Sequence, residues 1–491
     1  MYKSFITWQW HEELEAVWKQ LEISSCYGQH AFQQQTIYTG ECKNELSLAF
    51  DELTVFINGL RMHPEKGVAL LEFFRGIPDI RSELNLLNTG YGLRHEAYFK
   101  LKLFLLAHEK IEKEIYPWLR SLSLKSIELL SLQPCLAVLD PSNQRLPTFF
   151  LDGGFSEKLA EVRSLKRRVE QRLRTLKEEN DVTEWTERRN EVLRVETQEE
   201  EKALALLQKQ LDPYAKAWQQ YLQQLGALEL LLAKARLALR KEMVRPVISD
   251  DESLCFSGLR HPIVEGLLQQ KKRTFQAIDI ECCAGSTVIT GANMGGKSVT
   301  LRAIMINCLL FQMGYFVFAK EAKLPLFDHL TLLDEVRQSI HQGMSSFAME
   351  VCQFQQHVEA HNGKFVLLVL DEFGRSTNPQ EGSALMQAVT HYMQQQPGVT
   401  LIATHYDDVA TEAGAHYQVI GFSQLSKEQF RQAFEQGRNS LQVLQDYMDY
   451  RLEPASDLQR VPQEARLICK AFRLEQDIMN FMENKITKRN P

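Results

Sequence analysis

The segment at residues 291–298 constrains the fold of this chain more than any other. Its sequence, Gly-Ala-Asn-Met-Gly-Gly-Lys-Ser, follows Val288-Ile289-Thr290, which is typical of a buried strand, and apolar residues at helical spacing come after it. A glycine-rich turn between a strand and a helix lets backbone amides converge on a phosphate, which the helix dipole also favours. We therefore predict a phosphate-binding loop, formed by Gly291, Ala292, Asn293, Met294, Gly295, Gly296, Lys297 and Ser298.

Two side chains of this loop are suited to a nucleotide. Lys297 would reach the β- and γ-phosphates of ATP, and the Ser298 hydroxyl would bind Mg²⁺. The alternative is a glycine-rich turn that ends in Lys-Ser by chance. The strand and helix expected on either side favour nucleotide binding.

A second strand is predicted at residues 365–370, where six apolar residues are followed by Asp371 and Glu372. A fully apolar run of this length is typical of a parallel strand that is buried on both faces. Ligands of open α/β sheets bind at the carboxyl ends of the strands. Asp371 can hold Mg²⁺ through water, and Glu372 can orient and deprotonate an attacking water. Without the phosphate loop, a strand that ends in a polar turn would be the better interpretation.

Two further segments have candidate polar groups. A strand-like run at residues 399–404 ends at His405, which could sense the γ-phosphate or position the water, although such a histidine is more often a structural hydrogen-bonding group. Residues 343–350 contain Ser345 and Ser346, either of which could be an ordinary helix N-cap.

Four segments together resemble one family in order and spacing: residues 290–298, 345–350, 371–377 and 403–406. The Asn-Met-Gly-Gly-Lys-Ser form of the loop and the Asp-Glu-Phe-Gly-Arg-Ser-Thr form of the acidic strand resemble those of MutS-family ATPases. The resemblance covers about residues 50–491 and is strong only from residue 244 to 410. We expect the chain to lack the family's N-terminal mismatch-reading domain.

The resemblance implies roles for particular residues. Phe275 would stack on adenine, and Asn293 with the loop amides would hold phosphates. Ser345 or Ser346 would reach the γ-phosphate bound by a partner subunit, which implies a homodimer with composite sites. Lys297, Ser298, Asp371, Glu372 and His405 would complete a site for ATP and Mg²⁺. ATP binding would close the dimer, and hydrolysis would reopen it.

The predicted fold class is α + α/β. We expect a helical core (lever) domain at 1–150 and a long, coiled-coil-like helical arm at 151–243. A P-loop (ABC-type) α/β ATPase domain would follow at 244–440, and a C-terminal helical dimerisation segment at 441–491. The arm prediction depends on a run of Leu, Glu, Lys, Arg and Gln between 156 and 240 that contains almost no helix breakers.

The composition predicts a soluble, cytoplasmic protein. The nine cysteines are scattered without a C-x-x-C pair, as expected of reduced thiols. The N-terminus has no apolar signal region, and no apolar run is long enough to span a bilayer. The histidines have no metal-ligand spacing, so we expect no structural metal.

What the ATPase acts on stays open at this stage. A DNA-acting machine, of mismatch repair or recombination type, is what the family resemblance favours. The net charge of −7 and the acidic residues at 178–201 favour the alternative, a motor that remodels a protein partner such as a cobalamin-dependent aminomutase. The basic run at 157–177 could still line a DNA channel. A third interpretation is a nucleotide-binding dimerisation module without turnover.

Overall fold

The computed structural model describes residues 11–151, 155–175, 179–291, 296–334, 346–361, 363–421, 449–455, 469 and 474–489. The chain divides into two compact units. The helical unit comprises Glu22–Gln35 and Glu52–Ala235, and the sheet unit comprises Met1–Leu21, Thr36–Asp51 and Arg236–Pro491. The predicted domain limits at 150, 243 and 440 stay predictions. No helix in the described part of the chain combines the length and apolar character needed to cross a membrane.

The helical unit contains nine helices or parts of helices within its described residues. They are α2 (Cys26–Gln33), most of α3 (Lys43–Met62), α4 (Pro64–Gly76), α5 (Arg81–Thr89), α6 (His95–Glu114), α7 (Tyr116–Leu122), α8 (Gln133–Leu139), α9 (Glu157–Leu173) and most of α10 (Glu179–Arg240). Helix α10 continues through Pro213. Trp218 of α10 and Tyr98 of α6 are among the largest fully buried side chains of the helical unit.

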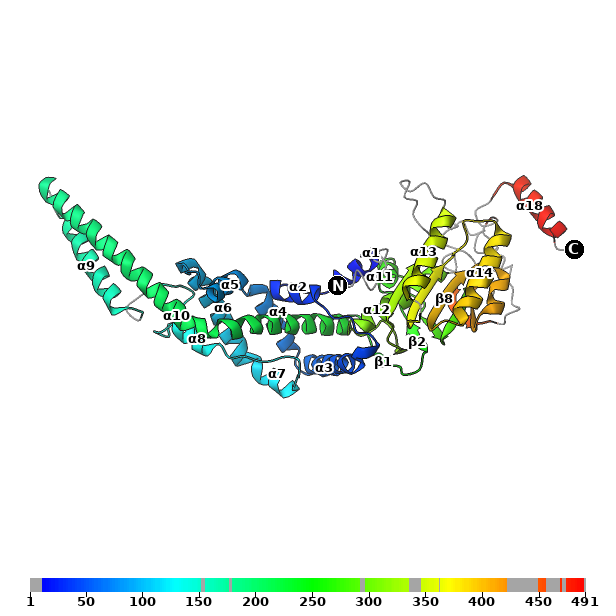
Figure 1. The fold of residues 1–491 in the computed structure, drawn as a ribbon, viewed down its shortest axis with the longest axis horizontal. Helices are drawn as coiled ribbons and strands as arrows, with labels where there is room; N and C mark the ends of the chain where they lie inside the picture. Colours follow the sequence, from blue (N-terminus) through cyan, green and yellow to red (C-terminus); the bar gives the residue numbers. More distant parts are fainter. Residues whose placement is uncertain are drawn as a thin grey trace. The chain divides into compact units, whose positions relative to one another are not determined.

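The charged residues of α9 and α10 pair with one another. Lys166 Nζ lies 2.6 Å from Glu196 Oε2, and Arg163 lies 3.2 Å from Glu196 Oε1 and 2.5 Å from Glu200. These contacts place α9 along the first part of α10 (Figure 1). Part of the acidic run at 178–201 is therefore neutralised by the basic run that precedes it in sequence. A coiled-coil arm stays a prediction.

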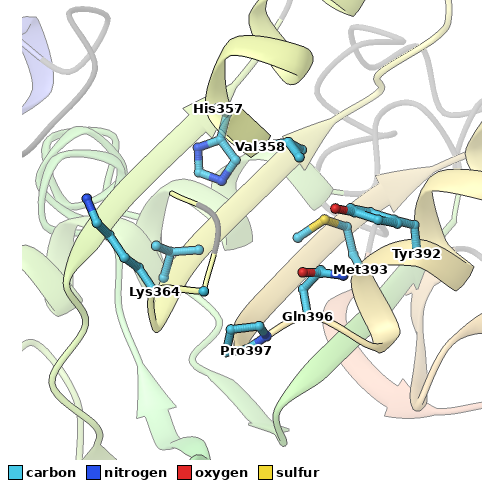
Figure 2. Close-up of a pocket in the computed structure, with 9 residues that line it drawn as sticks. His357, Val358, Lys364, Tyr392, Met393, Gln396 and Pro397 are labelled. Atoms are coloured by element: carbon cyan, nitrogen blue, oxygen red, sulfur yellow. The ribbon is translucent and has the colours of Figure 1, made fainter. Parts of the chain in front are cut away.

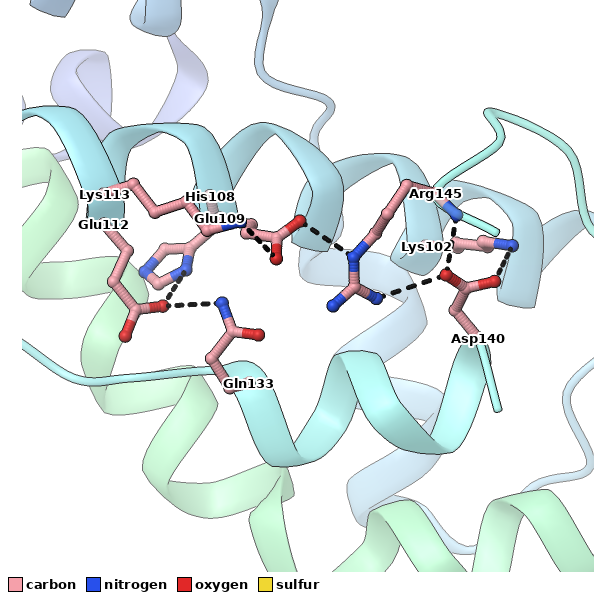
Figure 3. A network of polar contacts seen from close by, with 8 residues as sticks. All are labelled: Lys102, His108, Glu109, Glu112, Lys113, Gln133, Asp140 and Arg145. Carbon is pink, nitrogen blue, oxygen red and sulfur yellow. Dashed lines mark hydrogen bonds and ion pairs between the residues drawn. The ribbon is translucent and has the colours of Figure 1, made fainter. Parts of the chain in front are cut away.

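A polar network crosses the interior of the helical unit (Figure 3). Asp140 accepts hydrogen bonds from Lys102 Nζ at 3.0 Å and from Arg145 Nη1 at 3.2 Å, and Arg145 Nε lies 3.1 Å from Glu109 Oε2. Next to this network, burial lowers the pKa of His108 to about 4, so the ring is neutral at pH 7. Each of the buried charges at Lys102 and Asp140 has an opposite charge in contact, as burial requires.

The sheet unit contains two sheets in its described residues. The larger has six strands in the order β10 (Asp449–Pro454), β9 (Ala415–Gly421), β4 (Gly285–Thr290), β8 (Gly398–Thr404), β7 (Val366–Asp371) and β6 (His329–Leu333), all parallel except β10. The smaller has the order β1 (Val247–Ile248), β5 (Glu321–Leu324), β2 (Leu254–Leu259) and β3 (Ile278–Cys282). The α + α/β class is confirmed at this level.

Helices cover the central strands of the six-stranded sheet. Helix α12 (Lys297–Gln312) packs on β6, β7 and β8, and α14 (Pro379–Gln394) packs on β4 and β8. The unit also contains α1 (His11–Trp18), η3 (Gly40–Cys42), α11 (Pro262–Gln270), α13 (Ser346–His361), η4 (Asp407–Glu412) and α18 (Gln476–Arg489). All residues of β4 and β8 are buried, as expected of central parallel strands, and these residues include the hydroxyl side chains of Ser286, Thr287, Thr290, Thr400 and Thr404.

The C-terminal stretch, for which we expected helices, contributes a strand to the sheet. Strand β10 pairs antiparallel with β9 through Leu452 and Val419, and α18 is the helix described after it. This strand lies at the sheet edge, where only Leu452 is buried, so its apolar pattern is too weak to distinguish it from a loop.

Candidate functional site

Three parallel strands end side by side at one edge of the six-stranded sheet. Strand β8 lies between β4 and β7, with Thr290 opposite Thr404 and Asp371 opposite Ala403. The residues that follow these strand ends are Gly291, Glu372 and His405, all of them predicted site residues. Parallel pairing in this register brings the three segments together at the edge where open sheets bind ligands.

Lys297 links the glycine-rich turn to the acidic strand. It is the first residue of α12, and Gly296 before it has φ = 84° as the N-cap. The Lys297 side chain is buried, and its Nζ donates to the Gly291 carbonyl at 2.7 Å and lies 3.7 Å from Glu372 Oε1. Ala292, Asn293, Met294 and Gly295 are outside the described residues. The ammonium group therefore lies between the loop and the carboxylate.

Asp371 has an unsatisfied buried oxygen. Its Oδ1 is one of the buried polar atoms for which the described part of the chain provides no hydrogen-bond partner. Burial raises the pKa of the Asp371 carboxyl, and a hydrogen bond with Ser298 acts in the opposite direction. A carboxylate oxygen without a partner beside a hydroxyl group fits the hard oxygen ligands of a hydrated Mg²⁺. No group of three or more His, Cys, Asp or Glu side chains suited to metal occurs in the described ranges. Protein ligands at this position would therefore be few.

Glu372 begins a sharp turn in a strained conformation. Its φ of 52° lies in the left-handed region, which costs a non-glycine residue about 1 kcal/mol and is found preferentially at functional sites. Its backbone N–H donates to the Ala403 carbonyl at 3.0 Å, which ties the turn to β8. Arg375 Nη1 donates to Glu372 Oε2 at 2.8 Å, while Lys297 lies on the other oxygen. The carboxylate thus lies between two cations.

His405 lies directly after β8 with one ring nitrogen unsatisfied. Its Nδ1 is a buried atom with no hydrogen-bond partner among the described residues, and its ring centroid lies 4.4 Å from that of Tyr406. Burial lowers the pKa of His405, although the nearby charge of Glu372 opposes this. The ring is therefore neutral at pH 7 and can accept or donate one hydrogen bond.

Tyr450 is a residue at this edge that the sequence did not reveal. A Cβ atom at Gly296 would lie 2.9 Å from Tyr450 Cδ1, so the tyrosine ring covers the start of α12. The Tyr450 backbone N–H donates to Gln276 Oε1 at 2.7 Å, next to Phe275, which is half-buried. Tyr450 is 154 positions beyond Gly296 (450 − 296), and only the pairing of β10 with β9 brings it there.

Of the two predicted serines, only Ser346 is described, and it begins α13. Ser345 is outside the described residues. The second turn of α13 carries Glu350, which is buried and accepts a hydrogen bond from the Gly374 N–H at 2.8 Å. We did not predict this contact with the turn after β7, because nothing in the local pattern distinguishes Glu350 from a solvated glutamate.

A small cavity elsewhere in the sheet unit lies apart from these residues (Figure 2). It is lined by His357, Val358, Gly363, Lys364, Val366, Tyr392, Met393, Gln396 and Pro397. Its volume of about 20 Å³ is enough for roughly one water molecule. It cannot hold a nucleotide.

Comparisons with known proteins find relatives of this part of the chain. Residues 287–444 match the family model of MutS domain V. The chain is 34% identical over 205 residues to the DNA mismatch repair protein MutS of an Exiguobacterium species, a match that covers 41% of this chain and 24% of that protein. It is 33% identical over 253 residues to the MutS of Natronomonas pharaonis, covering 49% and 29% of the two chains.

These matches cover only part of this chain and part of each relative. The matched region spans about a quarter of the length of the curated relatives. The family model covers most of β4 and all of β7 and β8, with the residues that follow these strands, but it does not reach Phe275 or Tyr450. The matches confirm the predicted resemblance to the MutS family, and residues 287–444 are similar to MutS domain V.

Proposed function

We propose that this chain is a MutS-type ATP hydrolase whose active site is the edge formed by the ends of β4, β7 and β8. The observation that carries the proposal is the position of Lys297, whose Nζ lies between the Gly291 carbonyl and the Glu372 carboxylate. A buried lysine at the start of a helix, next to a glycine-rich turn and two strand-end carboxylates, supports phosphate binding.

The nucleotide would be held from three sides. Phe275 and Tyr450 would face the base, because Tyr450 covers the start of α12 and is hydrogen-bonded to the residue next to Phe275. The amides of residues 291–296, Asn293 and Lys297 would hold the phosphates. Ser298 and Asp371 would hold Mg²⁺, which neutralises charge on the β- and γ-phosphates when it is bound.

Glu372 would act as the general base for the attacking water. A carboxylate held at the start of a rigid turn can orient a water and take its proton. Phosphate oxygens would compete with Glu372 for Lys297, which frees Oε1 for the water. His405, neutral at pH 7 and with an unsatisfied Nδ1, is suited to a hydrogen bond with the water or the γ-phosphate.

The chain would act as a homodimer on DNA. Ser345 or Ser346 at the start of α13 would reach the γ-phosphate in the partner's site, so that each site is complete only in the dimer. The relatives carry the name of DNA mismatch repair proteins, which favours DNA over a protein partner. The ion pairs between α9 and α10 neutralise part of the acidic run and equally part of the basic run at 157–177, so the choice of DNA depends on the relatives.

A salt series tests the choice of partner. ATP hydrolysis would be measured with and without duplex DNA while the salt concentration is raised. We expect DNA to stimulate hydrolysis, with an affinity for DNA that falls steeply with salt because bound phosphates release counterions. Hydrolysis without any DNA binding at low salt would contradict the DNA part of the proposal and favour a protein partner. Lys297→Ala should abolish hydrolysis in either case.

A further inference from the structure

The buried carboxylate of Glu350 holds the turn that carries Glu372. Glu350 Oε2 accepts from the Gly374 N–H at 2.8 Å, and Oε1 accepts from the Ser376 hydroxyl. Both donors belong to the five residues that begin at Glu372. Glu350 itself is 7% exposed, so water does not compete well for these bonds.

The turn needs external support because its backbone is strained. Glu372 and Gly374 have φ values of 52° and 77°, both in the left-handed region. The Tyr406 hydroxyl donates to the Gly374 carbonyl at 3.3 Å. A Cβ atom at Gly382 would lie 2.7 Å from that carbonyl and 2.4 Å from Tyr406 Oη, so α14 can approach the turn this closely only with glycine there. The turn therefore contacts both α13 and α14.

Helix α13 contacts the turn at two positions one helical turn apart. Glu350 binds the amide and hydroxyl groups, and the Phe354 ring packs on Phe373 with centroids 5.6 Å apart. Residues at i and i+4 lie on the same helix face, so one face of α13 makes both contacts with the turn. Ser346, another four residues earlier, begins the same helix.

We propose that Glu350 is a positioning residue that sets the location of the Glu372 carboxylate and connects it to the start of α13. A displacement of α13 at Ser346 would pull on Gly374 and Ser376 and so move Glu372 away from Lys297. This inference rests on the proposed ATP hydrolysis, in which Glu372 is the base. It assigns Glu350 no contact with ATP or water.

Replacing Glu350 in two ways separates positioning from charge. Glu350→Ala removes both hydrogen bonds. Glu350→Gln can keep both, because its amide oxygen accepts from the Gly374 N–H and its amide nitrogen can donate to the Ser376 hydroxyl after that hydroxyl turns. Glu359→Ala is the matched control, since Glu359 lies on the exposed face of the same helix and accepts only from Gln355 among its described neighbours.

We expect Glu350→Ala to lower kcat by roughly tenfold to a hundredfold, because small misplacements of a reacting group have effects of that order. KM for ATP and the affinity for a fluorescent ATP analogue should stay within about twofold, since no nucleotide contact is lost. Glu350→Gln should keep kcat within roughly threefold, and Glu359→Ala should resemble the unsubstituted protein. A kcat unchanged in Glu350→Ala, or nucleotide affinity lost in parallel with kcat, would overturn the inference.

Amide hydrogen exchange gives a readout that does not depend on hydrolysis. Without nucleotide, a peptide covering 372–378 should exchange roughly tenfold faster in Glu350→Ala than in the unsubstituted protein or in Glu350→Gln, because a local contact is lost. Equal exchange in all variants would overturn the positioning role. If the unsubstituted protein does not hydrolyse ATP, the proposed function fails, and the exchange experiment alone decides whether Glu350 holds the turn.

Discussion

Two carboxylates have opposite surroundings: Asp140, which is buried in the helical unit, and Asp371, which is half-buried in the sheet unit. Asp140 lies between Lys102 and Arg145, and although burial raises its pKa, the hydrogen bonds from these residues bring it below the usual value. Asp371 has one oxygen with no partner among the described residues, and burial raises its pKa. Buried polar groups normally have their partners, so an exception needs a reason. The reason proposed here is a ligand.

The two carboxylates differ in whether the protein alone provides their polar partners. The network around Asp140 satisfies its own charges and can stabilise the helical unit without any ligand. The strand ends around Asp371 keep polar groups available, as the unsatisfied Nδ1 of His405 also shows. Such groups lower the stability of the protein alone and would be satisfied in the complex.

The largest effect on stability is expected from Asp140→Asn. The substitution leaves Lys102 and Arg145 without their full counter-charge in the interior, which should cost about 3 kcal/mol of unfolding free energy. Urea denaturation of the two proteins would measure the change. Because the pKa of Asp140 is depressed, its contribution is present above its unfolded pKa and is lost as the pH falls through the folded pKa. The difference between the two proteins should therefore shrink in acid.

Asp371→Asn should change the unfolding free energy in the opposite direction and stabilise the protein. The raised pKa means that folding disfavours the ionised carboxylate, so stability is lost as the pH rises from the unfolded pKa through the folded pKa. Removing the charge should therefore add about 1 kcal/mol at neutral pH without Mg²⁺ and nucleotide, by relieving an uncompensated burial. Thermal unfolding at pH 7 would measure it. A clear loss of stability would show that Asp371 is a structural group like Asp140.

The smallest effect is expected at an exposed ion pair. Arg189 Nε lies 3.6 Å from Glu170 Oε1, and both side chains are at least one third exposed. Glu170→Gln should change the unfolding free energy by less than about 0.5 kcal/mol, because exposed pairs contribute little. Urea denaturation at low and high salt would check this. A loss of unfolding free energy as large as that for Asp140→Asn would mean that the contribution of an ion pair to stability depends on the pairing itself and not on its burial.

The sequence predicted best what depends on local pattern. An unbroken apolar run located β7, and shorter strand-like runs located β4 and β8. The residues directly after these runs, Gly291, Glu372 and His405, were candidates for the site. The structure places these three together, while their roles stay predictions. The fold class followed from the same kind of pattern, because segments predicted to be helical come before a stretch in which short strands alternate with helices.

The contacts that the sequence did not predict are long-range. Tyr450 reaches Gly296 because β10 joins the sheet edge, and Glu350 reaches Gly374 because α13 packs on the turn after β7. Neither residue stands out in its own segment, because both depend on partners at least 24 positions away (374 − 350). The charge segregation of α9 and α10 was visible in the sequence, but its pairing required the register of the two helices.

One measurement tests the central claim most directly: ATP binding and hydrolysis by Glu372→Gln and by the unsubstituted protein. The substitution removes the proposed base but keeps the side chain's size and its contact with Arg375. Glu281→Gln, at an exposed position on β3, serves as the control. The account predicts ATP affinity within about threefold of the unsubstituted protein and hydrolysis slower by roughly a hundredfold or more. Hydrolysis at the same rate in both proteins would contradict it.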